Sequence, residues 1–403
     1  EVKNIFQETR SIEKKPKFCN LPEYIDSQIY DGKQLSPAVA LHLINEVHVV
    51  GRTEFIIKGN KAYIPRVITP EADMFMAEIE GWASISENFQ TLSLTTINAG
   101  IKVKKAVSLF GQANANYLHF LTETLTRLVV LDNENIHKEA VILIEDNLHP
   151  KFYDALSLLN INERPVIRVS PYEKVAVENL IYITPLCYTP PETRDWFQHH
   201  KLAPPRAEQF YFSKQGLELL RRKSVELSTQ YLPKTKHLAY SPNSNVEMDY
   251  LITNLNNPTR LSDIKKVYLY RHAVTTGNGR LLKNQTNLVD LLTDIGFMNF
   301  DIAELPFYEQ VHVLRNAQTV ISPVGAALGN MIFCEPGVKV ILLSPTYPGA
   351  TFFYFTNLLS CLGHEVSYVL GKQDPTTGHG YQEFYNRDFT IPINMVLSEL
   401  SNN

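Results

Sequence analysis

The sequence predicts an α/β protein with two Rossmann-like domains that face each other across a cleft. Three observations lead to this prediction. Apolar runs that read as buried strands alternate with amphipathic helical stretches in both halves of the chain, which is typical of βαβ units and a largely parallel sheet. A stretch rich in proline, 185–205, separates the two alternating sets. The chain has 403 residues, which is enough for two or three domains.

We expect the N-terminal Rossmann-like domain to span residues 1–187. Residues 1–46 are mixed and polar, with a charged break at 14–17. The most strongly periodic segment is a helix at 114–131, with apolar side chains at helical spacing. A second helix is expected at 150–159. Strands are expected at 47–50, 54–58, 62–65, 101–110, 140–144, 165–169 and 179–184.

The next predicted region, 188–264, contains the linker, a helix at 208–230 and a polar surface insertion at 233–263. We expect the C-terminal, donor-binding Rossmann-like domain at 265–372, and a tail with a final helix that returns to the first half at 373–403. The strands expected in the C-terminal domain are 266–270, 297–302, 319–321, 338–343 and 365–370. The helices expected after residue 264 are 286–295, 306–317, 325–333, 351–362 and 393–400.

Composition limits the possible partners and compartments. The chain is 44% hydrophobic and 20% charged with a net charge of -4, so it is not basic enough for wholesale nucleic-acid binding. The four cysteines form no Cys-x-x-Cys pair and are expected to be reduced thiols. No apolar run approaches the roughly 20 residues of a membrane span, and no signal peptide is visible. We therefore expect a cytoplasmic location, with attachment to the inner face of the membrane left open.

A candidate phosphate site lies between two buried strands, 319–321 and 338–343. Gly325, Ala326, Ala327 and Leu328 open the short helix between these strands. The N-terminus of a helix presents backbone N–H groups and positive dipole charge, and small residues let a phosphate approach. The alternative is that the glycine and the alanines only permit close packing of the helix on the sheet.

Cations are expected at the same edge of the sheet. Arg271 directly follows the strand 266–270, and Arg280 and Lys283 lie in the glycine-containing loop after it. Arginine binds phosphate through two parallel hydrogen bonds, so this loop is predicted to close over a diphosphate. The alternative is a solvated basic loop.

Three amide side chains lie near these residues in the sequence. Asn284 follows the basic loop, Gln310 lies in the first turn of the helix 306–317, and Asn330 lies on the short helix. Each could help to position a donor. Asn330 could equally be a local cap.

The helix 114–131 carries a polar stripe. His119, Glu123 and Arg127 recur every four residues, and Asn116 lies about one turn before His119. A carboxylate one turn away can orient an imidazole and make it more basic, as a general base for a hydroxyl requires. The alternative is a solvent-facing row of ion pairs. No cluster of metal-ligand spacing and no nucleotide-binding glycine motif is present, so we expect neither a metal nor a cofactor.

Several motifs together resemble glycosyltransferase family 61. They are Tyr268–Arg271, Gly279–Asn284, Gly296–Phe297, Leu305–Gln310, Asn316–Ala317, Gly325–Phe333 and the upstream helix segment Asn116–Glu123. The resemblance covers about residues 105–345 and implies a GT-B fold. It also implies inverting, metal-independent transfer from a nucleotide sugar, with bacterial members acting on capsule or surface polysaccharide. Two positions depart from the family pattern, because Val324 replaces the usual histidine and Leu342 stands near a usual glutamate.

The function predicted from these features is transfer of a sugar from a phosphate-linked donor to a hydroxyl of an oligo- or polysaccharide. His119 would be the base and Glu123 its partner, while Asn116 and Arg127 would lie on the acceptor side. Arg271, Arg280 and the turn at Gly325 would hold the donor phosphates. Two alternatives remain open: a non-catalytic module that binds a glycan or nucleotide within a polysaccharide-assembly complex, and a sugar-nucleotide epimerase.

Overall fold

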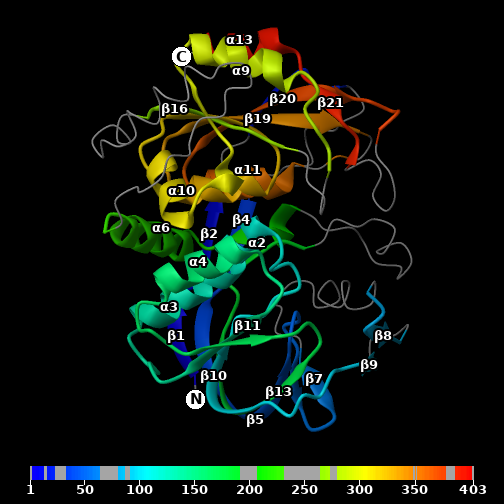
Figure 1. Ribbon diagram of the computed structural model, residues 1–403, viewed down its shortest axis with the longest axis vertical. Helices are drawn as coiled ribbons and strands as arrows, with labels where there is room; N and C mark the ends of the chain where they lie inside the picture. The colour runs from blue at the N-terminus through cyan, green and yellow to red at the C-terminus, as the bar shows by residue number, and fades with distance from the viewer. Residues whose placement is uncertain are drawn as a thin grey trace. The chain divides into compact units, whose positions relative to one another are not determined.

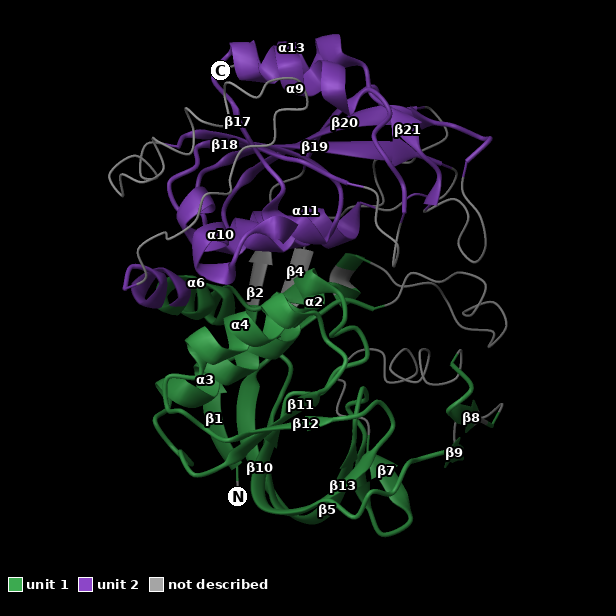
Figure 2. Ribbon diagram, in the orientation of Figure 1, with its two compact units in different colours: residues 1–12, 33–223 green, residues 13–32, 224–403 purple. Residues whose placement is uncertain are grey.

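The computed structural model shows a mixed α/β chain that divides into two compact units, coloured separately in Figure 2. Unit 1 contains residues 1–12 and 33–223, and unit 2 contains residues 13–32 and 224–403. The structure describes residues 2–12, 16–22, 33–63, 80–86, 91–190, 207–230, 264–272, 279–347, 350, 352–377 and 386–401. The predicted insertion at 233–263 and much of the predicted linker therefore lie outside the described residues.

Unit 1 is built on a sheet whose centre is parallel (Figure 1). Its parallel strands are β10 (Lys102–Ser108), β11 (Val141–Glu145), β12 (Val166–Val169) and β13 (Lys174–Ile183), in the order β12-β11-β10-β13. The helical segment 117–133 links β10 to β11, and α4 (Pro150–Leu159) links β11 to β12. This confirms the βα alternation and the extent of the helix predicted at 150–159, whereas the helix predicted at 114–131 begins three residues later and ends two residues later.

The other strands of this sheet are antiparallel, contrary to the expectation of a largely parallel sheet. They are β1 (Val2–Phe6), β5 (Val39–Val50), β6 (Ile56–Lys58) and β7 (Lys61–Tyr63). β5 pairs with β13 over the full length from Leu41 to Val50, and β1 pairs with β5. Residues 1–46, which looked polar and irregular in the sequence, thus supply an edge of the sheet.

The sheet of unit 1 is also strongly curled. Only residues 170–173 connect β12 to β13, although both strands run in the same direction, so that in a flat sheet the end of β12 and the start of β13 would lie at opposite ends. Four residues span at most about 14 Å, so the end of β12 must come close to the start of β13. Two backbone bonds agree with this: the Gly51 N–H donates to the Glu173 carbonyl and the Tyr172 N–H to the Gly51 carbonyl. The curled sheet encloses an apolar cluster that includes Val49, Ala106 and Val177.

Unit 1 is completed by short elements. They are β2 (Thr9–Ile12), β4 (Lys33–Ser36), β8 (Ala83–Ile85), β9 (Leu92–Leu94), β14 (Cys187–Tyr188), η4 (Ala207–Gln209) and β15 (Tyr211–Phe212). Three antiparallel pairs form among them: β2 with β4, β8 with β9, and β14 with β15. The helix expected at 208–230 is α6 (Lys214–Ser228), and the boundary between the two units falls within it.

Unit 2 is a doubly wound sheet of the flavodoxin type. Its parallel strands are β16 (Lys266–Leu269), β17 (Met298–Phe300), β18 (Thr319–Pro323), β19 (Lys339–Thr346) and β20 (Glu365–Gln373). Their order β17-β16-β18-β19-β20 corresponds to 2-1-3-4-5 in chain order. Its helices are α9 (Gln285–Asp294), η5 (Ile302–Glu304), α10 (Phe307–Leu314), η6 (Ala326–Phe333), α11 (Phe353–Cys361) and α13 (Ile393–Ser401).

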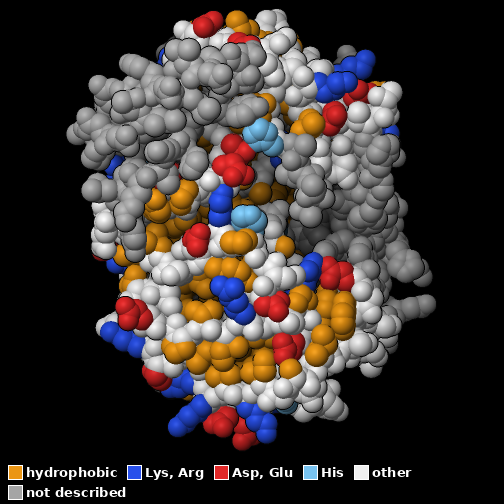
Figure 3. Space-filling view, viewed as in Figure 1, with side chains coloured by type: hydrophobic (Ala, Val, Ile, Leu, Met, Phe, Trp, Pro, Cys, Tyr) orange, Lys and Arg blue, Asp and Glu red, His pale blue; other side chains and the backbone are white. Residues whose placement is uncertain are grey.

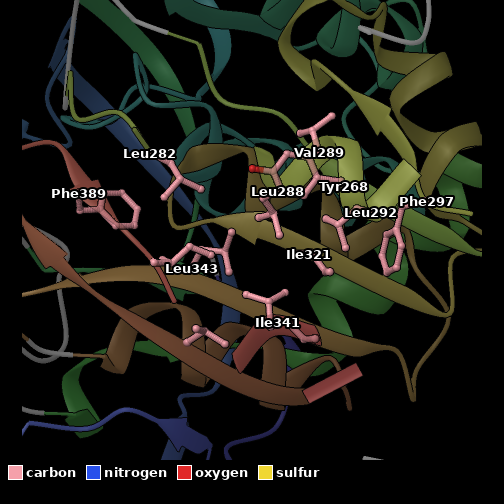
Figure 4. Close-up of a cluster of buried hydrophobic side chains, with 13 residues drawn as sticks. Tyr268, Leu282, Leu288, Val289, Leu292, Phe297, Ile321, Ile341, Leu343 and Phe389 are labelled. Carbon is pink, nitrogen blue, oxygen red and sulfur yellow. The ribbon is translucent and has the colours of Figure 1, made fainter. Parts of the chain in front are cut away.

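Helices cover both faces of this sheet. In Figure 1, α9 and α13 lie on one face, and α10 and α11 on the other. Figure 4 shows the core beneath α9, where Leu288 and Leu292 point toward Ile321 and Ile341 of the central strands. All four side chains are fully buried, and burial of each contributes about 1.5–3 kcal/mol relative to exposure. Gly296 ends α9 with a φ of 86°, a conformation that residues with a Cβ rarely adopt.

The C-terminal tail lies at the edge of unit 2. Its final helix α13 packs on β20 of the same unit, and from the first half of the chain it contacts an N-terminal strand. An N-terminal strand, β3 (Lys17–Cys19), runs parallel to β20 on the same edge as β21 (Phe389–Thr390). The Glu399 carboxylate of α13 accepts hydrogen bonds from Lys17 of β3 and from Ser367 of β20. It thereby connects both strands to the helix.

Candidate functional site

The topology of unit 2 identifies one edge of its sheet as a ligand-binding position. In a 2-1-3-4-5 sheet the connections leave the first and third strands in opposite directions. Here these strands are β16 and β18, and they are paired directly. Ligands of doubly wound folds bind in the crevice outside the carboxyl ends of these two strands. Arg271 follows the end of β16, and Val324 and Gly325 follow the end of β18.

Two guanidinium groups meet at this position. Arg271 donates from Nε to the Arg280 carbonyl at 3.0 Å and from one terminal nitrogen to the Val324 carbonyl at 3.4 Å. Arg280, whose side chain is buried, donates to the same Val324 carbonyl at 3.0 Å. Burial and the neighbouring charge of Arg280 lower the pKa of Arg271 to about 10. Two cations held side by side in a partly dry site favour an anionic ligand.

The position of Arg271 is fixed by its backbone. Gln285 at the start of α9 accepts from the Arg271 N–H at 3.1 Å and donates to the Arg271 carbonyl at 2.9 Å. The same Gln285 oxygen accepts from the buried Tyr268 hydroxyl at 2.8 Å. Gln285 was not among the predicted site residues, because its role depends on contacts with Tyr268 and Arg271 that form only in the folded unit.

Gly325 is required for the approach of Arg271. A Cβ added to Gly325 would lie 2.3 Å from a terminal nitrogen of Arg271, which is closer than any real contact. The glycine backbone is extended, with a φ of 170°, so space rather than conformational freedom demands the absence of a side chain. Glycine is the residue expected where another group comes close to the backbone, and the geometry at Gly325 agrees with this expectation.

The short helix after Gly325 is a 3₁₀-helix, η6, rather than an α-helix. Its first backbone N–H groups, those of Gly325, Ala326 and Ala327, precede the hydrogen-bonded part of the helix. The Leu328 N–H already donates to the Gly325 carbonyl at 3.1 Å. Of the four residues predicted to bind phosphate through their amides, Leu328 therefore has its N–H bonded within the turn, and phosphate binding at the other three stays a prediction.

The three amide side chains predicted to position the donor make contacts within unit 2. Asn284 pairs with the backbone of Ile391, donating to its carbonyl at 2.8 Å and accepting from its N–H at 3.2 Å. Gln310 is buried and donates to the Leu305 carbonyl at 2.9 Å. Asn330 is fully buried and donates to the Ala327 carbonyl at 3.1 Å. These contacts support the loops around the arginine pair, and direct donor contacts stay predictions.

Lys283 is directed elsewhere. Its ammonium lies 2.6 Å from a carboxylate oxygen of Asp374 and is about half exposed. Gly277 of the same predicted loop lies outside the described residues.

In unit 1, the predicted His119–Glu123 pair is formed. His119 Nδ1 lies 2.8 Å from Glu123 Oε1, and the side chains are 13% and 7% exposed. An imidazole that donates from Nδ1 to a carboxylate carries its lone pair on Nε2, the arrangement of a general base. The helix bearing the pair follows the carboxyl end of β10. Because the pair is largely buried, the alternative of a solvent-facing row of ion pairs is wrong for these two residues.

The helix is interrupted at the pair by a feature that periodicity did not predict. Residues 117–119 (α2) and 126–133 (α3) are α-helical, whereas Phe120–Leu125 (η3) form a π-helix that contains Glu123. Such π-helical turns are rare and often occur at functional sites. The only sequence signal is the run of threonines Thr122, Thr124 and Thr126, which are poor helix formers and are all fully buried.

Asn116 and Arg127 have different surroundings. Asn116 is exposed and caps α2, accepting from the Leu118 N–H at 3.0 Å. Arg127 is buried and donates to the carbonyls of Glu123 at 2.8 Å and Phe110 at 3.0 Å. Arg127 therefore holds the helix to the end of β10, and any effect on an acceptor would act through these neighbours. Its predicted acceptor contact stays untested.

A buried carboxyl that the sequence analysis did not single out lies at the same edge of the sheet. Glu145 ends β11, and its side chain accepts from the Gly111 N–H and from the Asn114 amide, both at 3.3 Å. Burial raises the pKa of Glu145 to about 8, against the lowering effect of these bonds and of Arg52 and Arg127. The sequence did contain a signal for Glu145, because this charged residue follows an apolar run that was predicted as a strand. Arg271 follows a predicted strand in the same way in unit 2.

Other surface features are unremarkable among the described residues. Figure 3 shows one face of the molecule, where the coloured side chains of both charges are interspersed with small hydrophobic patches. In the described ranges, no three His, Cys, Asp or Glu side chains group as metal ligands would. The described helices include none of the length and apolarity that a membrane crossing needs.

Comparison with known proteins gives one family. No curated protein matches the chain. A family model described as glycosyltransferase 61 matches residues 117–341. The match begins at the helix bearing His119, continues through β18 and η6, and ends at the third residue of β19. The match covers more than half of the chain and includes both the imidazole–carboxylate pair and the arginine pair. The chain therefore belongs to the glycosyltransferase 61 family.

Proposed function

We propose that this protein transfers a sugar from a nucleotide-sugar donor to a hydroxyl group of a growing surface glycan, with inversion at the anomeric carbon. Family membership supports glycosyltransferase activity as such. The observation that carries the donor assignment is the convergence of Arg271 and Arg280 on the Val324 carbonyl, at the strand ends where doubly wound folds bind phosphates.

In this proposal the arginines replace a metal ion. A nucleoside diphosphate leaving group gains negative charge as the bond from its oxygen to the anomeric carbon breaks. Fixed guanidinium groups and backbone N–H groups stabilise such charge without reorganisation. Arg271, Arg280 and the amides at Gly325 to Ala327 would supply these donors, and transfer would be metal-independent.

The acceptor hydroxyl would be deprotonated by His119. Its Nε2 takes the proton while the hydroxyl oxygen bonds to the anomeric carbon, and the Glu123 carboxylate stabilises the resulting imidazolium. Direct attack by the acceptor from the face opposite the leaving group inverts the stereochemistry. General-base catalysis of this kind contributes typically 10²–10⁴-fold in rate.

We further propose a GT-B arrangement, with the acceptor domain at 1–187 and the donor domain at 265–372. The proposal includes a capsule or surface-polysaccharide acceptor, action at the cytoplasmic side of the membrane and peripheral association with an assembly complex. The support is the doubly wound topology of unit 2, the parallel strands of unit 1 and the family match.

A second candidate is a module that binds a nucleotide or glycan without turnover. It is favoured by Val324, which stands where the family resemblance leads us to expect a histidine. The Val324 side chain is buried, so only its backbone carbonyl takes part in the arginine cluster. Titration calorimetry with nucleoside diphosphates, together with a product assay over a donor panel, separates the two: binding without product favours the module.

The proposed mechanism is tested by two substitutions and one control. We expect His119→Ala and Arg271→Ala each to reduce transfer by at least about 10²-fold, since each removes a group that acts on the transition state. Lys283→Ala also removes a cation from the basic loop, but this cation is paired with Asp374. The Lys283→Ala variant should therefore keep a transfer rate within about threefold of the wild type. Thermal unfolding must show all three variants folded. Near-normal turnover of either active-site variant would contradict the mechanism.

A further inference from the structure

The π-helical turn of unit 1 is stabilised by its own side chains. The Thr122 hydroxyl donates to the Leu118 carbonyl at 2.9 Å, and the Thr126 hydroxyl donates to the Thr122 carbonyl. Arg127 Nε donates to the Glu123 carbonyl at 2.8 Å. Where a helix changes its hydrogen-bond pattern, carbonyls that lose their usual partner need another donor. These three side chains provide such donors along the inside of the helix.

Thr124 is the exception among the threonines, because it reaches out of the helix. Its hydroxyl donates to Asn114 Oδ1 at 2.7 Å. The Asn114 amide nitrogen in turn donates to the Leu109 carbonyl at 2.9 Å and to Glu145 Oε1 at 3.3 Å. One buried asparagine thus connects the π-helical turn to the ends of β10 and β11.

The surroundings leave Asn114 little freedom. It is 2% exposed, and a Cβ added to Gly111 would lie 2.6 Å from its Oδ1. Glu145, its acceptor, is 2% exposed and also accepts from the Gly111 N–H at 3.3 Å. Because all three partners of Asn114, Leu109, Thr124 and Glu145, are buried, losing one hydrogen bond leaves a polar group without water, and this favours a single arrangement of the network.

We propose that Asn114 and Thr124 are positioning residues, which fix the π-helical turn to the strand ends and thereby hold the Glu123 carboxylate against His119. Glu123 immediately precedes Thr124, so rotation or return of this turn to regular α-helix moves the carboxylate relative to the imidazole. The inference rests on the proposed role of His119 as the base. Neither Asn114 nor Thr124 contacts the imidazole in this scheme; both act through Glu123.

The test uses three substitutions of fully buried threonines in one helix. Thr124→Val removes the hydroxyl that bonds Asn114 but keeps the shape of the side chain. Thr124→Ser keeps the hydroxyl. Thr126→Val makes the same chemical change as Thr124→Val at a hydroxyl that bonds only within the helix. A general loss of helix stability would affect both valine variants, whereas loss of positioning would affect only Thr124→Val.

The first measurement is steady-state transfer. We expect Thr124→Val to lower kcat by about tenfold to a hundredfold with an unchanged KM for the donor, because misplacement by about 1 Å has effects of this size. Thr124→Ser and Thr126→Val should remain within about threefold of the wild type. Equal losses in the two valine variants, or no loss in Thr124→Val, would overturn the proposal.

The second measurement does not require turnover. The hydrogen bond between His119 and Glu123 can be followed by NMR of the labelled imidazole, with His119→Gln to assign the signal. His119 Nδ1 lies 2.8 Å from Glu123 Oε1, so the Nδ1–H signal should shift or disappear in Thr124→Val and stay unchanged in Thr126→Val. An unchanged signal in Thr124→Val would contradict the positioning role. If the wild type shows no transfer but Thr124→Val changes this signal selectively, the proposed function fails and the positioning role stands.

Discussion

At the residue scale, the arginine pair and the imidazole–carboxylate pair differ in how far their contacts could be predicted from the local sequence. His119 and Glu123 are four residues apart on one helix, so their contact could be predicted from spacing alone. Arg271 and Arg280 are held by the Val324 carbonyl, more than 40 residues further along the chain. That contact depends on the pairing of β16 with β18, which no local pattern encodes. The sequence predicted the presence of the arginines at the edge but not their common acceptor.

The contact between Gly325 and Arg271 gives a prediction at this scale. In Gly325→Ala the new Cβ would meet Arg271 at 2.3 Å and displace its guanidinium. We expect the affinity for a nucleoside diphosphate, measured by titration calorimetry, to fall by about tenfold or more, since a charged hydrogen bond contributes about 1.5–3 kcal/mol.

A double-mutant cycle provides the control for Gly325→Ala. If the substitution acts by displacing Arg271, it should have little further effect in an Arg271→Ala background. Full additivity of the two losses would show that the added methyl group disturbs the site in another way, and would contradict this explanation.

At the scale of elements, one helical segment in each unit differs from a regular α-helix. The segment at His119 contains a π-helical turn, and the segment after Gly325 is a 3₁₀-helix. Apolar periodicity predicted the first segment, because burial of one face depends mainly on spacing. The second was predicted from its small residues. Neither signal could show how the turns are hydrogen-bonded, since side chains such as Arg127 and Thr126 compete for backbone carbonyls only in the folded chain.

The N-terminal strand β3 gives a prediction about pH. Burial by itself raises the pKa of Glu399, but the hydrogen bonds from Lys17 and Ser367 lower it by more. The pKa of Glu399 in the folded protein is therefore below its usual value of 4.5. A lowered pKa means that the carboxylate stabilises the folded state above pH 4.5 and that this stabilisation is lost as the pH falls through the folded-state pKa. The protection factors of the Lys17–Cys19 amides, which compare observed with intrinsic exchange at each pH, should therefore fall on acidification.

Two variants test the assignment to Glu399. Glu399→Gln should show the lower protection of this strand even at neutral pH, and its dependence on acidification should be reduced. Glu365→Gln alters an exposed carboxyl at the start of the neighbouring strand β20 and should behave as the wild type. If the strand's protection responds to acid equally in all three proteins, another group controls it.

At the scale of the whole molecule, the chain contributes to each unit from more than one segment. Residues 13–32 belong to unit 2, although the segments before and after them belong to unit 1. The proline-rich stretch 185–205 lies within unit 1, and the later boundary between the two units falls within α6. Local composition cannot reveal that β3 joins β20, because the two strands are separated by about 350 residues and pair only in the folded state.

Ligand binding gives a prediction at this scale. The proposed phosphate site is formed by residues of unit 2, so a nucleoside diphosphate should slow hydrogen exchange in peptides from 264–272 and 279–347. At a hundredfold excess over Kd, binding to the native state alone stabilises it by about 2.7 kcal/mol. Uridine, guanosine, adenosine and thymidine diphosphates are suitable probes. Inorganic sulfate at the same ionic strength controls for general screening, and protection confined to peptides from 102–190 would contradict the donor assignment.

The sequence by itself determined the α/β class, the βα order of both halves, the types of residue at the strand ends and the His119–Glu123 pair. These features depend on periodicity and on neighbours within one or two helical turns, which the chain encodes locally. Only the tertiary structure decided the curl of the first sheet, the 2-1-3-4-5 order of the second, the shared acceptor of the two arginines and the Glu145–Asn114–Thr124 network. Each of these joins residues distant in the chain, and their pairing is selected by burial and by the need of buried polar groups for partners.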